Sequence, residues 1–320
     1  MTWGIHSTQP VPAFCCWNSR SGPFTVGAFT ITPMLTDHSA FDAYMLLIEV
    51  DGRRVLYTGD FRLHGRKGVL VAHLMANPPP RLDALILEGT NLGTDKPVMR
   101  EDMLENDFVA LMEQTAGRVF VTWSAQNIDR TVTMYKAARR ASRPLVIDLY
   151  TADVLEQVAP GTGLPRPGWE GITVVVTKAF GWLYRQRGRA DFITRMVRLR
   201  AIAARNIPGR AVLMLRGSLI RDYERADIYP TKADAHAFSM WRGYEGDARY
   251  RPTLDWCEAG GTKTTHLHTS GHASSSDLRA FATAMRADRV IPVHGQNWDT
   301  EQAGFDNLVR LADGQRLDVP

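Results

Sequence analysis

The chain has 320 residues, of which 44% are apolar, and a formal net charge of +4. This length predicts about two domains, and the apolar fraction is sufficient for a buried core. No apolar run approaches the roughly 18–20 residues of a membrane-spanning helix, and the N-terminal residues do not read as a secretory signal. Three cysteines are an odd number and include the adjacent Cys15 and Cys16, which does not indicate a disulfide framework. We therefore expect a cytoplasmic protein that does not bind membranes.

The positive charge is concentrated in the middle of the chain. Residues 91–250 contain 24 Lys and Arg against 18 Asp and Glu, a net of +6. Most of the basic residues are arginine, whose guanidinium group binds phosphate oxygens bidentately. This excess permits a nucleic-acid surface, and a merely basic surface explains it equally well.

The first hundred residues have the pattern of short strands. Residues 43–50 and 53–58 are apolar strands joined by Asp51-Gly52, which predicts a hairpin with a tight turn. Residues 25–31 read as one internal strand. Residues 82–87 predict another short strand, which ends at Glu88.

The middle of the chain alternates between strands and helices. We expect strands at 118–123, 144–149, 172–177 and 211–215, and helices at 126–140 and 191–206. Such alternation is typical of a parallel α/β unit.

The last seventy residues return to the first pattern. Residues 263–268 predict a strand, residues 274–277 (SSSD) are typical of a helix N-cap, and residues 289–293 predict a final strand. The organisation is that of one domain interrupted by another. We expect a first part at 1–95, an inserted domain at 96–255 and a return segment at 256–320.

Three candidate metal ligands follow predicted strands. His38, Asp60 and His294 each stand just past an apolar run, and zinc uses imidazole and carboxylate ligands in hydrolytic sites. His38 and Asp60 are 22 residues apart, as are His272 and His294. The residue types and their positions suggest a metallo-hydrolase.

The segments around these residues resemble the ordered motifs of a known group of enzymes. These segments are residues 36–39 (TDHS), 57–61 (YTGDF), 87–90 (LEGT), 269–274 (TSGHAS) and 293–295 (VHG). Together they are similar to metallo-β-lactamase-fold hydrolases of the β-CASP group, with RNase J the nearest branch. The resemblance implies an α/β fold, namely an αββα metallo-β-lactamase sandwich that is incomplete at its N-terminus and carries an inserted α/β β-CASP-like domain.

The resemblance also implies a role for individual residues. Two zinc ions would be held by His38, Asp60 and His294, with Asp60 as the bridge. His272 would contact the scissile phosphate or assist proton transfer, and Glu88 would orient a ligand histidine. Ser270 would donate to a phosphate oxygen. The implied activity is hydrolysis of RNA phosphodiester bonds by a metal-bound hydroxide, and a homodimer is compatible with the family.

Ser124 and Arg130 are further candidates, from their position rather than from the resemblance. They lie where a predicted strand leads into a helix, so the backbone there could hold a phosphate. N-capping of the helix explains this pattern equally well.

The sequence departs from the family at its most diagnostic motif. No His-x-His-x-Asp-His precedes His38, so each metal keeps two of four protein ligands and we expect weak zinc binding. Two explanations stay open: an N-terminally shortened chain, or a natural degenerate member that retains the scaffold. Hydrolysis of a small ester or lactone is the alternative activity, and a catalytically inactive scaffold that binds nucleic acid or a partner is the alternative to an enzyme.

Overall fold

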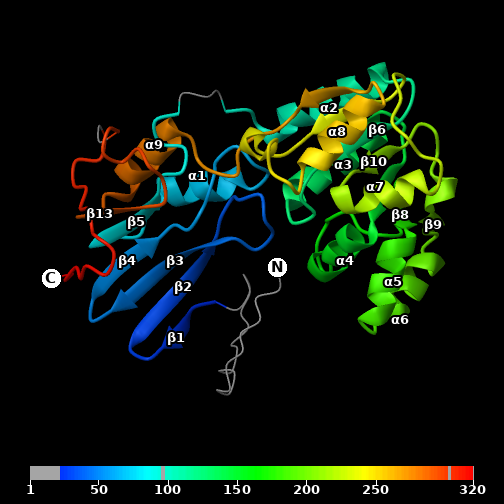
Figure 1. The fold of residues 1–320 in the computed structure, drawn as a ribbon. Coiled ribbons are helices and arrows are strands. Elements are labelled where there is room, and N and C mark those ends of the chain that lie inside the picture. The colour runs from blue at the N-terminus through cyan, green and yellow to red at the C-terminus, as the bar shows by residue number, and fades with distance from the viewer. Residues whose placement is uncertain (1–21, 95–97, 302–303, 320) are drawn as a thin grey trace.

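The protein consists of two units that lie side by side, each built around one β-sheet (Figure 1). The computed structural model describes residues 22–94, 98–301 and 304–319; Cys15 and Cys16 lie outside these ranges. The chain passes from the first unit to the second after strand β5 and returns after strand β12. The expected α/β class is confirmed.

The first unit contains a six-stranded sheet with the order β1-β2-β3-β4-β5-β13. Its strands are β1 (Phe24–Val26), β2 (Phe29–Leu35), β3 (Tyr44–Val50), β4 (Arg53–Tyr57), β5 (Ala84–Glu88) and β13 (Val290–Val293). Strands β1 to β4 pair antiparallel, whereas β4, β5 and β13 pair parallel. The C-terminal ends of β2, β4, β5 and β13 therefore lie along one edge of the sheet, an edge formed by strand ends and not by an outermost strand.

Tight turns join two of the three consecutive antiparallel strand pairs described in this sheet. Asp51 and Gly52 have φ values of 48° and 77°, the left-handed pair that suits a two-residue hairpin turn, and this confirms the predicted hairpin. The prediction of a single strand at 25–31 was wrong. Gly27 has a φ of 59° and the chain reverses there, so Val26 pairs with Phe29 and β1 forms the edge of the sheet.

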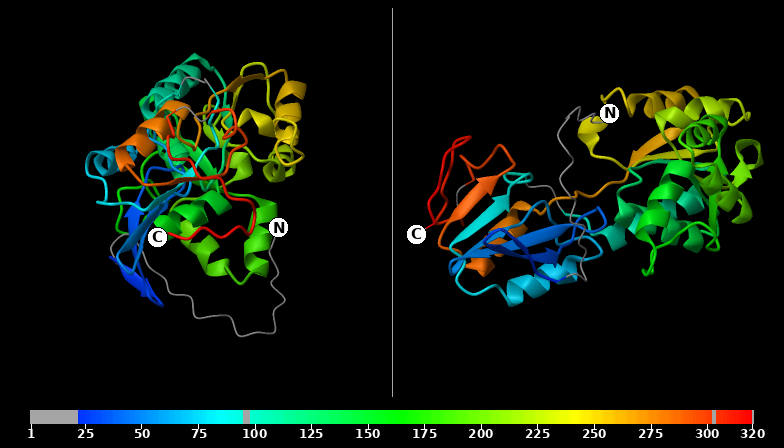
Figure 2. Two further views of the ribbon diagram at one scale, coloured as in Figure 1. Left: turned by 90° about the vertical axis from the view of Figure 1, so that its left-hand side faces the viewer. Right: turned by 90° about the horizontal axis from the view of Figure 1, so that it is seen from below.

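Helices α1 (Gly68–Ala76) and α9 (Ser275–Met285) cover one face of this sheet. Val71 of α1 and Phe281 of α9 are buried against Leu56 and Leu85 of the sheet. Figure 2 shows these two helices packed beside the strands. Side chains of the opposite face, such as Ile48, are only half-buried. Among the described residues, this sheet has its helical layer on one side.

The second unit contains a seven-stranded sheet in which every pairing is parallel, with the order β12-β11-β6-β10-β7-β8-β9. Its strands are β6 (Val119–Thr122), β7 (Leu145–Asp148), β8 (Ile172–Val176), β9 (Ile202–Ala203), β10 (Val212–Met214), β11 (Ala235–Phe238) and β12 (Lys263–His266). The predicted parallel α/β unit is confirmed. Strand β12 pairs with β11, so the chain returns to the first unit after His266 rather than at residue 256.

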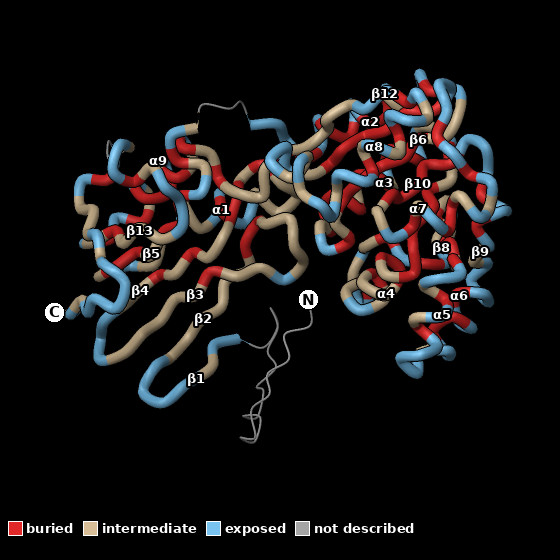
Figure 3. The backbone as a smooth tube through the Cα atoms, viewed as in Figure 1, coloured by how far each residue is buried: buried red, intermediate tan, exposed pale blue. Residues whose placement is uncertain are grey.

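Helices cover both faces of this second sheet. The helices are α2 (Glu101–Gln114), α3 (Ile128–Arg140), α4 (Leu149–Val158), α5 (Lys178–Gln186), α6 (Ala190–Arg198), α7 (Gly217–Glu224) and α8 (Arg251–Ala259). One core joins the sheet to α2, α3, α4, α5 and α6, and a separate core joins its other face to α7 and α8. Figure 3 shows the consequence, because the central strands of this unit are buried. No helix among the described residues is long and apolar enough to cross a membrane.

The helix predicted at 191–206 is shorter than expected. Helix α6 ends at Arg198, and Arg200 has a φ of 65°, a left-handed backbone that cannot continue a helix. The chain then enters β9 and the short 3-10 helix η1 (Ala204–Asn206). The helix predicted at 126–140 is confirmed as α3.

Candidate metal centre

Five of the predicted site residues converge at one edge of the six-stranded sheet. His38 follows β2, Asp60 follows β4, Glu88 ends β5 and His294 follows β13, while His272 lies in the loop before α9. These strands all end at the same edge, so their following residues meet although they are far apart in sequence. The edge thus gathers three imidazoles and two carboxylates.

The separations within this cluster suit a metal ion. Asp60 Oδ1 and His294 Nδ1 are 3.2 Å apart, close to the roughly 3.3 Å between two ligand atoms of a tetrahedral zinc with bonds near 2.0–2.1 Å. Ligand atoms of Asp60, Glu88 and His272 also lie within 4.8 Å of one another, but Glu88 and His272 hydrogen-bond to each other, so Asp60 is the member of this group that is shared with His294. A mixed set of imidazole and carboxylate donors fits zinc, so the residues present fit the expected ion.

Glu88 holds His272 in a fixed orientation. Its buried carboxylate accepts hydrogen bonds from the backbone N–H groups of Phe61 and Thr90, each at 3.2 Å. It also accepts one from His272 Nδ1 at 3.2 Å. Burial lowers the pKa of His272, but the hydrogen bond and charge of Glu88 outweigh it, and the pKa is raised overall. Glu88 contacts only Nδ1 of His272, so this carboxylate does not bond to the second ring nitrogen, Nε2.

His38 is also anchored through one ring nitrogen. Its Nδ1–H donates to the carbonyl oxygen of Gly271 at 2.8 Å, which leaves the lone pair of Nε2 available. Burial lowers the pKa of His38 and so favours the neutral ring. A neutral imidazole is the form that binds metals. The rings of His38 and His272 are 6.0 Å apart between centroids.

His294 has a strained backbone. Its φ is 50°, a left-handed value that is uncommon for a residue with a side chain, and Gly295 follows with a φ of 101°. A Cβ atom at Gly295 would lie 2.2 Å from the carbonyl oxygen of Gly89, so only glycine fits there. Trp298 Nε1 donates to the carbonyl oxygen of His294 at 2.9 Å and holds this turn. The strained turn positions the imidazole beside Asp60.

The loop that carries Ser270 and His272 is held by residues that the sequence did not single out. Asn91 Nδ2 lies 3.0 Å from Ser270 Oγ, 3.0 Å from the carbonyl oxygen of His272 and 3.1 Å from that of Ala273. His64 Nε2 donates to the carbonyl oxygen of Ser270 at 2.8 Å. The position of Asn91, three residues after Glu88, is the only signal that could have suggested it.

A buried arginine connects this loop to both units. Arg62 donates to the carbonyl oxygen of Ser270 at 2.9 Å and to Asp129 Oδ2 at 2.5 Å. Its Nε lies 3.8 Å from Asp37, the neighbour of His38. Burial raises the pKa of Asp37 in spite of this arginine. Arg62 therefore fixes the positions of two cluster segments at once.

Ser124 and Arg130 lie apart from the cluster. Arg130 is fully buried, and its guanidinium group bonds to Glu101 at 2.9 Å and to Ser239, so it is not exposed to solvent. Ser124 follows β6 and lines a separate cavity at the carboxyl ends of β6 and β10 in the second unit. Ser270 lines the cavity that contains His272.

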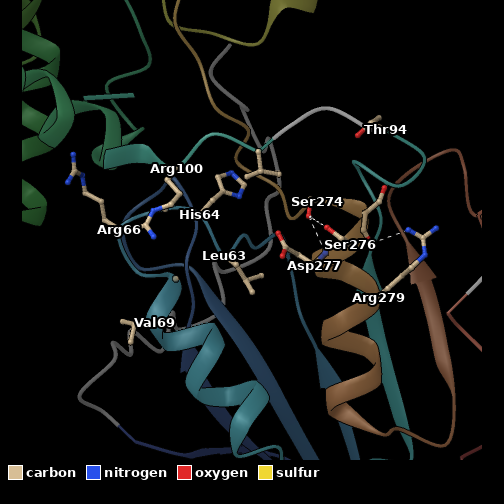
Figure 4. A pocket seen from close by; sticks show the side chains of 14 residues that line it. Leu63, His64, Arg66, Val69, Thr94, Arg100, Ser274, Ser276, Asp277 and Arg279 are labelled. Carbon is tan, nitrogen blue, oxygen red and sulfur yellow. Dashed lines mark hydrogen bonds between the residues drawn. The ribbon is translucent and has the colours of Figure 1, made fainter. Parts of the chain in front are cut away.

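Two neighbouring cavities lie near the cluster, and one of them reaches it at His272. That cavity, of about 340 Å³, is lined by His272 and Ser270 from the first unit and by Trp241 and Arg242 from the second. A larger and more open one, of about 930 Å³, lies beside it and is lined by residues that include Arg66, Arg100 and Arg279 (Figure 4). His64, Thr94, Val98 and Ser274 line both. Both units therefore line the cavity that reaches His272.

The fold and the cluster define an α/β protein with a zinc-type donor set, and comparison with known proteins agrees. Residues 262–303, which include His272 and His294, match the family model described as "RMMBL: Zn-dependent metallo-hydrolase RNA specificity domain". This match supports the metallo-β-lactamase superfamily. No curated protein matches the sequence significantly.

A solved structure supports the fold. The crystal structure of a protein of unknown function from Enterococcus faecalis V583 is similar, with a TM-score of 0.66 and 18% sequence identity. The alignment covers 91% of this chain and 63% of that protein, so this chain spans less than two thirds of its length. At this identity the likeness shows the fold alone.

Proposed function

We propose that this chain is a zinc-dependent metallo-hydrolase of the RNase J-like type that acts on RNA phosphodiester bonds. The observation that carries the proposal is the convergence of Asp60, His294, His272 and Glu88 from four distant segments. The matched RNA-specificity domain contains two of these residues, and this match supports RNA over other phosphodiesters.

We propose that the six-stranded unit corresponds to a metallo-β-lactamase domain and the seven-stranded unit to a β-CASP-like insertion. Support comes from the chain order, because the second unit is inserted between β5 and β13, which pair directly. The cavity of about 340 Å³ is lined by both units, as expected for a cleft that holds a chain-like substrate.

The residues of the cluster divide into ligands and groups that act on the substrate. His38, Asp60 and His294 would hold zinc, which when bound supplies Lewis acidity at a phosphoryl oxygen and activates water. His272, oriented by Glu88, turns Nε2 toward the substrate and donates to a phosphate or leaving oxygen. Ser270 donates to a second phosphate oxygen.

Zinc binding and RNA cleavage by the purified chain test this proposal. The change Asp60→Asn removes a ligand charge, so we expect zinc content after dialysis against a fixed zinc concentration, measured by mass spectrometry, to fall about tenfold. Cleavage of a labelled single-stranded RNA should fall with it. The control is Asp51→Asn, which changes an exposed carboxylate in a turn that also suits asparagine and should leave both quantities unchanged.

Other outcomes select the alternatives. RNA binding that survives chelation, weakens steeply with salt and leads to no cleavage would identify an inactive scaffold. Hydrolysis of a lactone without cleavage of RNA would favour the small-ester activity. Equal zinc content in Asp60→Asn and Asp51→Asn would exclude the ligand role of Asp60.

A further inference from the structure

The seven-stranded sheet contains a position where its connections change direction. From β6 the chain crosses through α3 on one face toward β7, whereas from β10, the neighbour of β6, it crosses through α7 on the other face toward β11. In open parallel sheets such a reversal leaves a crevice at the carboxyl ends of the strands, where ligands commonly bind. None of the five residues of the metal-ligand cluster lines the crevice between β6 and β10.

A cavity of about 480 Å³ occupies this crevice. Ser124 follows β6, Arg216 and Ser218 follow β10, and Arg249 and Tyr250 lie just before α8. The lining contains two arginines and, among the described residues, no carboxylate. The cavity is large enough for a ligand of nucleotide size.

Both arginines are held in place by neighbouring groups. Arg216 Nε lies 3.0 Å from Asp148, and its guanidinium group is 5.0 Å from the centroid of the Tyr150 ring. Arg249 pairs with Asp247 at 2.7 Å and lies 5.6 Å from the centroid of the Tyr250 ring. Arg216, paired with a buried aspartate, is therefore largely fixed before a ligand arrives, which reduces the entropy cost of binding an anion, whereas Arg249 is 71% exposed and is restrained by Asp247 and Tyr250.

The segment before α8 connects this cavity to the one that contains His272. Trp241 and Arg242 line the cavity beside the cluster, and Arg249 and Tyr250 line the crevice. Trp241 is 56% exposed, unusual for so large an apolar side chain. Exposed aromatic rings interleaved with arginines are typical of surfaces that stack bases and bind phosphates.

We propose that this crevice is a second binding site, which takes a nucleotide unit. Arg216 and Arg249 bind its phosphate, Ser124 and Ser218 donate to phosphate oxygens, and Tyr250 provides an aromatic contact for the base. The unit can come from a free nucleotide or from single-stranded RNA that extends across residues 241–250. Binding at this site does not require hydrolysis at the metal-ligand cluster.

Binding of adenosine monophosphate and of a single-stranded oligoribonucleotide to the full chain tests the proposal, by calorimetry and fluorescence anisotropy with a chelator present. Loss of a charge-assisted contact in Arg249→Gln should weaken binding about tenfold. The matched control is Arg251→Gln. Arg251 is also exposed and paired with an aspartate, but it does not line the cavity, so its loss should leave affinity unchanged.

A second variant separates binding from folding. Ser218→Glu places a negative charge in the cavity and should weaken binding more than tenfold. It lies in the first turn of α7, where an acidic side chain is favourable, so the melting temperature should not fall.

The two ligands identify the source of the nucleotide unit. A free-nucleotide site is supported if both ligands bind and Arg249→Gln lowers the affinity for each by a similar factor. Binding of RNA alone supports an extended RNA contact. Equal affinities of Arg249→Gln and Arg251→Gln for every ligand that binds, or no binding of either ligand by the unaltered chain, would overturn the proposal. Zinc content and cleavage are measured separately, so these results do not depend on the proposed hydrolysis.

Discussion

At the scale of single residues, the candidate site residues depend on neighbours that would contact neither zinc nor substrate. The side chain of His272 is oriented by Glu88, and its backbone carbonyl accepts from Asn91. Arg62 is fully buried and contacts both the carbonyl oxygen of Ser270 and the carboxylate of Asp129. Removal of such a residue leaves other charges buried without a partner, so its effect should exceed that of a surface pair.

The change Arg62→Met tests this dependence. It leaves the buried carboxylates of Asp37 and Asp129 without their arginine, so we expect the free energy of unfolding in urea to fall by about 3–5 kcal/mol. The control is Arg54→Met, because Arg54 forms a partly exposed pair with Glu49 and should cost less than about 1 kcal/mol. Similar losses in the two variants would contradict the structural role assigned to Arg62.

At the scale of secondary-structure elements, helix α9 fixes where the loop with His272 ends. Ser274 is its N-cap, and its hydroxyl oxygen accepts a hydrogen bond from the backbone N–H of Asp277 at 3.1 Å. The predicted N-cap at 274–277 is thereby confirmed. Because the cap lies two residues from His272, the start of α9 determines the direction in which the loop enters the first unit.

The change Ser274→Ala should destabilise this start. It removes the acceptor for the Asp277 N–H, so we expect a loss of about 1 kcal/mol in the free energy of unfolding. Ser274→Asp restores an acceptor and adds a charge that is favourable at a helix N-terminus, and it should recover most of the loss. A Ser274→Asp variant as unstable as Ser274→Ala would show that capping is not the role of this residue.

At the scale of the whole molecule, a buried ion network joins the two units. Glu101 of α2 pairs with Arg130 at 2.9 Å and lies 3.7 Å from Arg62 of the first unit. Its backbone N–H donates to the carbonyl oxygen of His64 at 3.0 Å. Burial alone would raise the pKa of Glu101, but the adjacent arginines outweigh it and lower this pKa to about 2.

This network predicts a pH dependence of stability. The folded-state pKa of Glu101 is below its ordinary value of 4.5, so its ionised form stabilises the protein above pH 4.5. That contribution, on the order of 3 kcal/mol, should be lost as the pH falls from 4.5 toward 2. Urea denaturation across this range measures it. Glu101→Gln should flatten the profile, whereas Glu113→Gln, an exposed change in the same helix, should not.

Local patterns in the sequence predicted most of the elements and their order. The turn at Asp51-Gly52, the strand–helix alternation of the middle segment and the N-cap of α9 are short-range signals, because the residues that form each one are close in the chain. The sequence also placed His38, Asp60, Glu88 and His294 at the ends of strands and His272 in a loop, and these positions made them candidates.

Tertiary structure alone decided which of these residues meet. Asp60 and His294 are 234 positions apart, and only the parallel pairing of β4, β5 and β13 brings them to one edge. The pairing of β12 with β11, the burial of Arg130 against Glu101 and the contacts of Asn91 with the loop before α9 likewise join distant segments, and Arg62 joins the two units through Asp129. Such contacts leave no periodic trace in the sequence, because they join single side chains from distant segments rather than repeated positions on one strand or helix.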